Sequence, residues 1–267
     1  MEGTKIRLID EMPELNDPIF IEGLPGVGNV GRIAVGYLLE ELGAKKFAEL
    51  MSSHFMPFVL IHQSSAVHVL KNEIYYWKAE KEGQRDIVFL IGDSQSVDPV
   101  GHYEIVETVL DFLEKLGVKS MVTTAGLSVE ERDDNPLIGV VSEPEIVEKY
   151  SDYNIDFDAG SKVGTIIGAS GLFLGLGRYR GIKGLCLLGQ TETMPEIPDP
   201  KTAEVILKVL VKILNVEIDM SELKNKIKEM EKFMKKIQKV QSKAVSQMLR
   251  EKMGQGEAGQ EELKYIG

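Results

Sequence analysis

The chain has 267 residues, of which 43% are apolar and 27% are charged, and its formal net charge is −11 at pH 7. These values are typical of a globular protein with a sizeable core and exclude bulk disorder. No apolar run approaches the roughly 18 residues of a membrane-spanning helix, and the first residues lack the apolar stretch of a signal peptide. We therefore expect a soluble, cytoplasmic protein without a membrane partner.

The charge is unevenly distributed along the chain. Residues 221–253 contain ten Lys and Arg against four Glu, a net charge of +6, so the remainder of the chain carries −17. An acidic body argues against a globular domain that binds nucleic acid. We interpret the basic segment as the solvated face of a coiled coil, and we expect no nucleic-acid partner.

Short apolar runs alternate with helical patterns from Ile6 to Val216. Six runs are rich in β-branched or aromatic residues and bounded by Gly, Asp or Pro, which predicts strands. These runs are Pro18–Ile21, Phe55–His62, Glu73–Lys78, Ile87–Ile91, Lys119–Thr124 and Ile182–Leu188. The hairpin-like stretch Val67–Lys78, with a turn signal at Lys71-Asn72, is expected to add to the sheet in antiparallel direction. The segment Gly126–Gly139 is expected to be irregular.

Residues typical of helix starts and ends lie between these runs. In two of the predicted helices, an N-cap aspartate is followed by proline at the first helical position. Helices are expected from Asp98-Pro99 to Gly117, after Asp199-Pro200, and from Gly31 to Gly43. Alternation of strands and helices predicts an α/β domain over residues 1–219, a three-layer α/β/α sandwich with a largely parallel sheet.

The segment Gly26-Val-Gly28-Asn-Val-Gly31 matches the G-x-G-x-x-G pattern of dinucleotide-binding turns between a predicted strand and a predicted helix. Glu49 lies near the expected position of a ribose-binding acid. The pattern is weak, because the chain has 26 Gly and shows no second nucleotide-contacting element. We favour a structural turn in which side chains at Gly26, Gly28 and Gly31 would clash. A nucleotide- or nucleoside-binding α/β enzyme remains the alternative.

The histidines, the acids at strand ends and the cysteine form no pattern that predicts a catalytic or metal-binding site. The four histidines, His54, His62, His68 and His102, lack metal-ligand spacing. Four acids at expected strand ends are interpreted as capping and loop residues; they are Asp93, Asp98, Asp133 and Asp134. The single Cys186 lies in an apolar run and is interpreted as a buried small hydrophobe. We expect no catalytic residue, no metal site and no cofactor.

Glycines and Ala169 recur at helical spacing between Gly160 and Gly177, opposite larger apolar residues such as Ile166, Ile167 and Phe173. Small residues on one helical face allow very close packing. We expect this face to pack within the chain, and a subunit interface is the alternative.

The C-terminal region combines a heptad pattern with a tail. An Asp219-x-x-Glu222 capping box begins a predicted helix over residues 220–253, about 45 Å long if continuous. Its seam is predicted to mediate oligomerisation and comprises Leu223, Ile227, Met230, Met234, Ile237, Ala244 and Met248. A helix that packs back on its own domain is the alternative. Residues 254–267 are expected to form a flexible linker, rich in Gly and Gln, and a tail ending in Tyr265-Ile266-Gly267.

Several segments together resemble the archaeal members of the proteasome assembly chaperone family. They are Gly23-Leu-Pro-Gly-Val-Gly-Asn-Val-Gly31, Gly171-Leu-Phe-Leu-Gly-Leu-Gly177, Gly184-Leu-Cys-Leu-Leu-Gly-Gln190, Pro198-Asp-Pro-Lys-Thr-Ala203 and Asn215-Val-Glu-Ile-Asp-Met-Ser-Glu-Leu223. The resemblance covers about residues 1–250. It implies a three-layer α/β fold, no catalysis, a homo-oligomer (a tetramer favoured), and contact with the α-ring of the core proteasome.

The resemblance also implies a role for the last residues of the chain. Family members that activate the proteasome carry a C-terminal hydrophobic–Tyr–any motif, with Tyr second from the end. Here Tyr265 is third from the end and Lys264 precedes it. We expect Tyr265, Ile266 and Gly267 to dock into a pocket of the α-ring, in a register that differs from the usual one. The expected function is that of a non-enzymatic assembly chaperone homologue or proteasome activator.

Overall fold

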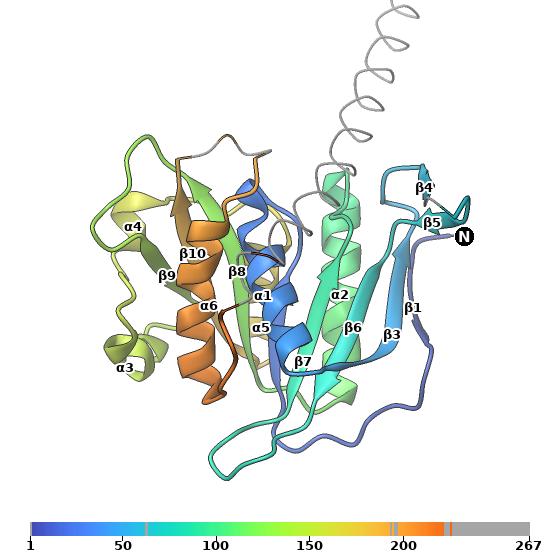
Figure 1. Ribbon diagram of the computed structural model, residues 1–267, viewed down its shortest axis with the longest axis horizontal. Coiled ribbons are helices and arrows are strands. Elements are labelled where there is room, and N and C mark those ends of the chain that lie inside the picture. Colours follow the sequence, from blue (N-terminus) through green and yellow to red (C-terminus); the bar gives the residue numbers. More distant parts are fainter. Residues whose placement is uncertain (1, 62–63, 193, 195–196, 222–224, 226–267) are drawn as a thin grey trace, which may run out of the picture. The chain divides into compact units, whose positions relative to one another are not determined.

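A computed structural model describes residues 2–61, 64–192, 194, 197–221 and 225 (Figure 1). All of these residues belong to the unit formed by Met1–Lys228. The predicted C-terminal helix lies outside the described residues, apart from residues 220, 221 and 225, and the predicted tail over 254–267 lies wholly outside them. No helix among the described residues is long and apolar enough to cross a membrane.

The secondary-structure elements alternate along most of the chain. The described strands are β1 (Thr4–Leu8), β2 (Ile19–Gly23), β3 (Lys45–Ser52), β4 (Val59–Ile61), β5 (Val67–Val69), β6 (Asn72–Trp77), β7 (Ile87–Gly92), β8 (Ser120–Ser128), β9 (Leu137–Val141) and β10 (Lys183–Thr191). The described helices are η1 (Val27–Asn29), α1 (Val30–Glu41), α2 (Pro99–Lys115), α3 (Ile146–Tyr150), η2 (Ser151–Tyr153), α4 (Ala159–Lys162), α5 (Ala169–Tyr179) and α6 (Pro200–Leu214).

One eight-stranded sheet has the order β1-β3-β6-β7-β2-β8-β10-β9. The four central strands, β7, β2, β8 and β10, run parallel, whereas β1, β3 and β6 on one side and β9 on the other pair antiparallel. The predicted parallel sheet is therefore confirmed at its centre, and the flanking strands make the whole a mixed sheet. For β3, β6 and β7 the connections explain the direction, because no crossover helix separates these strands, and strands joined without one can pair antiparallel.

Helices cover both faces of the parallel strands (Figure 1). On one face α1 and α6 lie side by side, and Ile33, Leu38 and Leu210 bury against Ile21 and Phe89 of the strands. The apolar positions of α6 form one buried stripe, as predicted from its pattern, whereas α1 is buried on nearly all sides, with only Arg32, Glu40 and Glu41 less than fully buried.

The opposite face is covered by α2 and α5, which also contact each other. Phe20 of β2 meets Phe173 of α5 edge to face, with ring centroids 5.4 Å apart. Phe47 of β3 stacks on Phe112 of α2 at 5.8 Å. The three-layer α/β/α arrangement is thus confirmed over the centre of the sheet.

The predicted helix caps are confirmed. The Asp98 carboxylate accepts the N–H of Gly101 at 2.8 Å, and the Asp199 carboxylate accepts the N–H of Thr202 at 3.1 Å. Each aspartate is followed by proline at the first helical position. Gly117, just beyond α2, has φ +78°, a backbone conformation that ends the helix and favours glycine.

Some predicted boundaries were wrong. The strands β1 and β3 were not predicted, and only Val59–Ile61 of the run Phe55–His62 forms a strand, with His62 outside the described residues. That strand, β4, pairs with β5 in a separate two-stranded sheet, so β5 and β6 form no hairpin. The predicted antiparallel addition is confirmed for β6, which pairs antiparallel with β3 and β7. Part of the segment expected to be irregular belongs to β8 and β9.

Candidate functional site

The glycine turn joins β2 to α1 at the carboxyl ends of the parallel strands, the edge at which α/β sheets bind ligands. After Gly26 the chain makes one turn of 3-10 helix, in which Gly28 has φ +60° and Asn29 has φ +49°. Glycine adopts such angles without steric cost. The N–H of Asp199 donates to the carbonyl of Gly28 at 2.8 Å and ties the turn to the start of α6.

Two glycines allow this turn to touch β8 directly. A Cβ on Gly31 would lie 2.4 Å from Thr124 Oγ1 and 2.6 Å from Thr124 O. A Cβ on Gly126 would lie 2.2 Å from the carbonyl oxygen of Val27. These distances are shorter than any real Cβ contact, so glycine is required at both positions. Protein atoms fill the space at these points, so Gly31 has a packing role that needs no ligand, and a Cβ on Gly28 would lie 3.2 Å from Val30 Cγ2. The clash expected at Gly26 was wrong, because a Cβ there would meet only Gln95 Nε2, at 3.8 Å.

A nucleotide-binding turn and a packing turn differ in their response to ligand. We expect millimolar NAD, FAD or ATP to leave the melting temperature of the protein unchanged. Binding at a hundred times the dissociation constant would stabilise the native state by about 2.7 kcal/mol. Differential scanning calorimetry at constant ionic strength measures this, and a saturable rise in melting temperature with any of the three would support the nucleotide-binding alternative.

A carboxylate is buried beside the turn. Glu22 of β2 is fully buried, and no cation among the described residues lies within ion-pair distance of it. Its Oε1 accepts the N–H of Leu24 at 2.8 Å, and its Oε2 accepts the hydroxyl of Ser170, in the first turn of α5, at 2.9 Å. Burial raises the pKa of Glu22 to about 7, although these hydrogen bonds lower it. Through these hydrogen bonds the Glu22 carboxylate cross-links β2 to α5 in a site closed off from solvent.

Gln95, in the loop after β7, connects the same elements. Its Nε2 donates to the carbonyl of Pro25 at 2.6 Å, and its Oε1 accepts the N–H of Ala169 at 2.9 Å. The glycine turn, the β7–α2 loop and the start of α5 are therefore held together by side chains from β2 and from this loop. The arrangement fixes three connections at one edge of the sheet.

The acids singled out in the sequence do not form one cluster. Three of them have separate basic partners: Asp93 with His68 at 2.6 Å, Asp98 with His54 at 2.8 Å, and Asp133 with Lys162 at 2.7 Å. Asp134 is exposed. Within the described part of the chain, no group of three or more His, Cys, Asp or Glu side chains could hold a metal ion. These acids therefore cap and tie separate loops.

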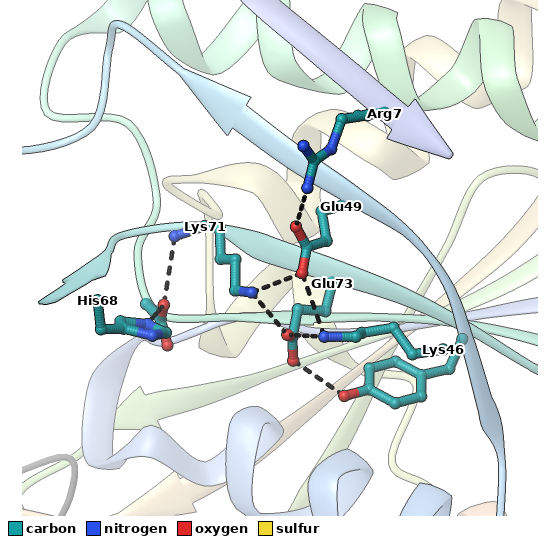
Figure 2. A network of polar contacts seen from close by, with 8 residues as sticks. Arg7, Lys46, Glu49, His68, Lys71 and Glu73 are labelled. Atoms are coloured by element: carbon teal, nitrogen blue, oxygen red, sulfur yellow. Dashed lines mark hydrogen bonds and ion pairs between the residues drawn. The ribbon is translucent and has the colours of Figure 1, made fainter. Parts of the chain in front are cut away.

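A network of ion pairs covers one face of the antiparallel strands (Figure 2). Its members are Arg7 of β1, Lys46 and Glu49 of β3, Lys71, and Glu73 and Tyr75 of β6. The hydrogen bond from Lys71 to Glu49, 2.5 Å long, is the main reason why the pKa of Glu49 falls to about 2. Glu49 is thus engaged by neighbouring lysines, and β6 and β7 separate its strand from β2. The structure does not bring it to the glycine turn as a ribose-binding acid would require.

The glycine-rich segment forms two helices with a break between them. Phe173 of α5 is buried as expected, but Ile167 lies in the break and is 95% exposed. A groove of about 540 Å³ runs between α4, α5 and β9, and Gly171 and Gly175 form part of its wall. No atom lies within 4 Å of a Cβ placed on Gly175, so this part of the small-residue face is open.

The docking and oligomerisation residues predicted in the C-terminal region lie outside the described residues. Cys186 is buried as expected. Glu22 was missed, and its only sequence signal is a lone acid directly after the apolar run Pro18–Ile21.

Comparisons with known proteins identify the family of this chain. Residues 20–238 match the model of the PAC2 family. An uncharacterised protein of Methanocaldococcus jannaschii is 31% identical over 98% of this chain and 96% of its own length.

Two solved structures from Pyrococcus furiosus are also similar. PbaB, an archaeal proteasome activator, has a TM-score of 0.79 and 39% identity, covering 89% of this chain and 100% of PbaB. PbaA, an archaeal homologue of proteasome-assembly chaperone, has a TM-score of 0.70 and 26% identity, covering 90% of this chain and 99% of PbaA. These matches confirm the resemblance carried by the glycine motifs. The chain belongs to the PAC2 family.

Proposed function

We propose that this protein is a non-enzymatic, homo-oligomeric factor that binds the α-ring of the core proteasome through its C-terminal tails. The observation that carries this proposal is the 39% identity to the proteasome activator PbaB over 89% of the chain. Bound in this way, the protein guides assembly of proteasome subunits or opens the gate for substrates. We favour a cytoplasmic tetramer.

The described polar side chains support a binding role rather than catalysis. The carboxylate with the most strongly raised pKa, Glu22, is fully buried and bonded to Leu24 and Ser170. Perturbed groups of catalytic sites instead lie in clefts that a substrate reaches. The carboxylates of Glu49 and Glu73 are held by lysines on the sheet face. These arrangements support strand and loop packing.

The C-terminal residues have the chemistry of a docking tail. The Gly267 carboxylate can pair with a cation of a pocket, the Tyr265 ring can pack against an apolar wall, and Ile266 can fill the space between them. Seven linker residues, 254–260, give a root-mean-square reach of roughly 15 Å if flexible. Several tails held by one oligomer can occupy a ring of pockets together, so modest affinity for each tail is multiplied by effective concentration. The seam over residues 223–248 is proposed to hold the oligomer.

Deleting Tyr265–Gly267 is expected to abolish binding to the core proteasome, because all three proposed contacts are removed from every copy. A pull-down of the purified core proteasome measures binding, and hydrolysis of a small peptide by the proteasome measures gate opening. Deletion of residues 261–267 is expected to have the same effect.

The matched control replaces Glu261 and Glu262 with glutamine, which changes the same tail but keeps its last three residues. This variant should bind as the wild type does, and both proteins should keep the oligomeric mass and melting temperature. If the truncated protein binds the α-ring as tightly as the wild type, the tail is not the docking element. Binding without faster peptide hydrolysis would indicate an assembly chaperone rather than an activator.

A further inference from the structure

The small two-stranded sheet presents an apolar surface, which we call the β4–β5 face: Val59, Ile61, Val67 and Val69. Val59 pairs with Val69 and Ile61 with Val67 across the two strands. Directly opposed residues share one face of a sheet, as do alternate residues along a strand, so all four side chains lie on the same side. Their exposed fractions are 45% for Val59, 61% for Ile61, 67% for Val67 and 52% for Val69. Neighbouring exposed apolar residues mark interaction surfaces, whereas single ones do not.

The opposite side of this sheet anchors it to the body. Leu60 of β4 is buried, and His68 of β5 meets the carboxylate of Asp93, at the end of β7, with 2.6 Å between Nε2 and Oδ2. The outward direction of the β4–β5 face is therefore fixed by contacts on its underside. An isolated two-stranded hairpin is marginally stable in water, so burial of its second face against a partner would stabilise it further.

The segment that forms this face and its neighbouring groove contains no Asp, Glu, Lys or Arg, although Asp93 lies on the underside of the sheet and Lys71 follows it in the chain. Charged residues make up 27% of the chain, yet none occurs from Leu50 to Leu70. The chain as a whole has a net charge of −11, so two copies repel each other at most contacts. Because solvent-exposed charges are screened beyond about 8 Å at physiological salt, an uncharged surface largely escapes that repulsion. A partner as acidic as this chain benefits most from an uncharged contact surface, and a second copy of the chain is such a partner.

The apolar surface continues beyond the four residues. A groove of about 480 Å³ adjoins Val59 and Val69 and is lined also by Phe55, Met56 and Phe58. A standard protein interface buries about 800 Å² on each partner, more than four aliphatic side chains provide. Phe55 and Met56 are themselves buried, so the groove adds little area, and the β4–β5 face forms one small apolar contact within an oligomer that other contacts also hold.

We propose that the β4–β5 face is a homotypic contact, in which two copies of this chain stack these faces about a two-fold axis. A two-fold contact requires a patch that is complementary to itself, and two flat faces of β-branched side chains meet this condition at the usual sheet spacing of about 10 Å. The contact joins the α/β bodies directly. It goes beyond the proposed function, and it holds or fails whether or not the tails bind a proteasome.

The test replaces Val59 and Val67 with lysine in the full chain. These positions are not opposite each other, so the two new charges do not meet within one sheet, but in the stacked pair they face the partner's apolar residues. We expect the concentration at which the oligomer is half dissociated to rise by about tenfold or more. Sedimentation velocity over a dilution series measures it, and the melting temperature of the dissociated chain should change little because both positions are exposed.

The matched control replaces Met12 and Val100 with lysine, which adds the same charge at exposed positions outside both the β4–β5 face and the glycine-rich segment. This variant should dissociate as the wild type does. Equal dissociation of all three proteins would overturn the inference and leave the oligomer to other contacts, and so would a wild type that is monomeric throughout.

A cross-linking experiment tests the same contact without adding charge. Val67→Cys in the full chain should form dimers with a bifunctional thiol cross-linker whose spacer matches the sheet spacing of about 10 Å, whereas Val100→Cys should not. A direct disulfide is not expected, because it requires Cα atoms less than about 7 Å apart. The native Cys186 does not compete, because it is buried and burial raises the pKa of its thiol to about 12. Equal cross-linking of the two variants would also overturn the inference.

Discussion

Gly31→Ala is expected to destabilise the native state by about 2–3 kcal/mol, the upper range for an overpacked core. The new methyl group would lie 2.4 Å from Thr124 Oγ1 and 2.6 Å from Thr124 O, and the second of these atoms belongs to the backbone of β8. The side chain alone cannot relieve the clash, so α1 must move away from the sheet. The clash with Oγ1 also disturbs the hydrogen bond that this hydroxyl donates to the carbonyl of Glu22, 2.8 Å long, which joins β8 to β2.

Gly175→Ala is the matched control, because Gly175 also lies inside a helix but has nothing within 4 Å of the added methyl group. Alanine has the higher helix propensity, so this variant should be as stable as the wild type or more stable, by up to about 1 kcal/mol. Urea unfolding of the three proteins measures both differences. If Gly31→Ala matches the control, the turn is not packed on β8 and the glycine pattern needs another explanation.

The central part of the fold could be predicted because its signals are local. The aspartate and proline pairs at Asp98 and Asp199 begin α2 and α6, and both caps are present. The antiparallel strands beside the central ones could not be predicted from such local signals. In β3 the residues Phe47–Met51 include Ala, Glu, Leu and Met, which favour helices, and a register shift after Lys46 breaks the strand alternation. The pairing of that strand with β1 and β6 overrides its local preference.

The side chains of the candidate site were harder to predict from local sequence patterns than the secondary structure was. The position of the glycine turn between a strand and a helix was evident from spacing alone. Glu22 was not recognised, because one of its buried hydrogen-bond partners, Ser170, lies 148 residues later in the chain. Likewise, Glu49 was expected near the turn from its separation in sequence, but the sheet order places two strands between β3 and β2. Local patterns locate a turn, and only the strand order decides which side chains lie beside it.

The wild-type protein is expected to lose about 3 kcal/mol of stability, relative to Glu22→Gln, as the pH rises from below 4.5 to above 7. Burial raises the pKa of Glu22 in the native state from its ordinary value of 4.5 to about 7. Between these values the native state holds a proton that the unfolded chain has released. The stabilisation is therefore complete below the unfolded pKa and is lost as the pH rises through the native one. Glutamine is nearly isosteric and neutral, so its Oε1 can still accept the N–H of Leu24 and the variant lacks this dependence.

The measurement is the difference in unfolding free energy between wild type and Glu22→Gln, determined by urea unfolding from pH 5 to 8, over which most of this loss falls. Other titrating groups cancel in the difference, because they are present in both proteins. Glu49→Gln is the control with the opposite shift: the pKa of Glu49 is lowered to about 2, so Glu49 is ionised in both states over most of this range. Its difference from the wild type should therefore vary little with pH. A difference for Glu22→Gln that is equally flat would show that Glu22 does not titrate near neutrality, and that the buried carboxylate gains more from Leu24 and Ser170 than its desolvation costs.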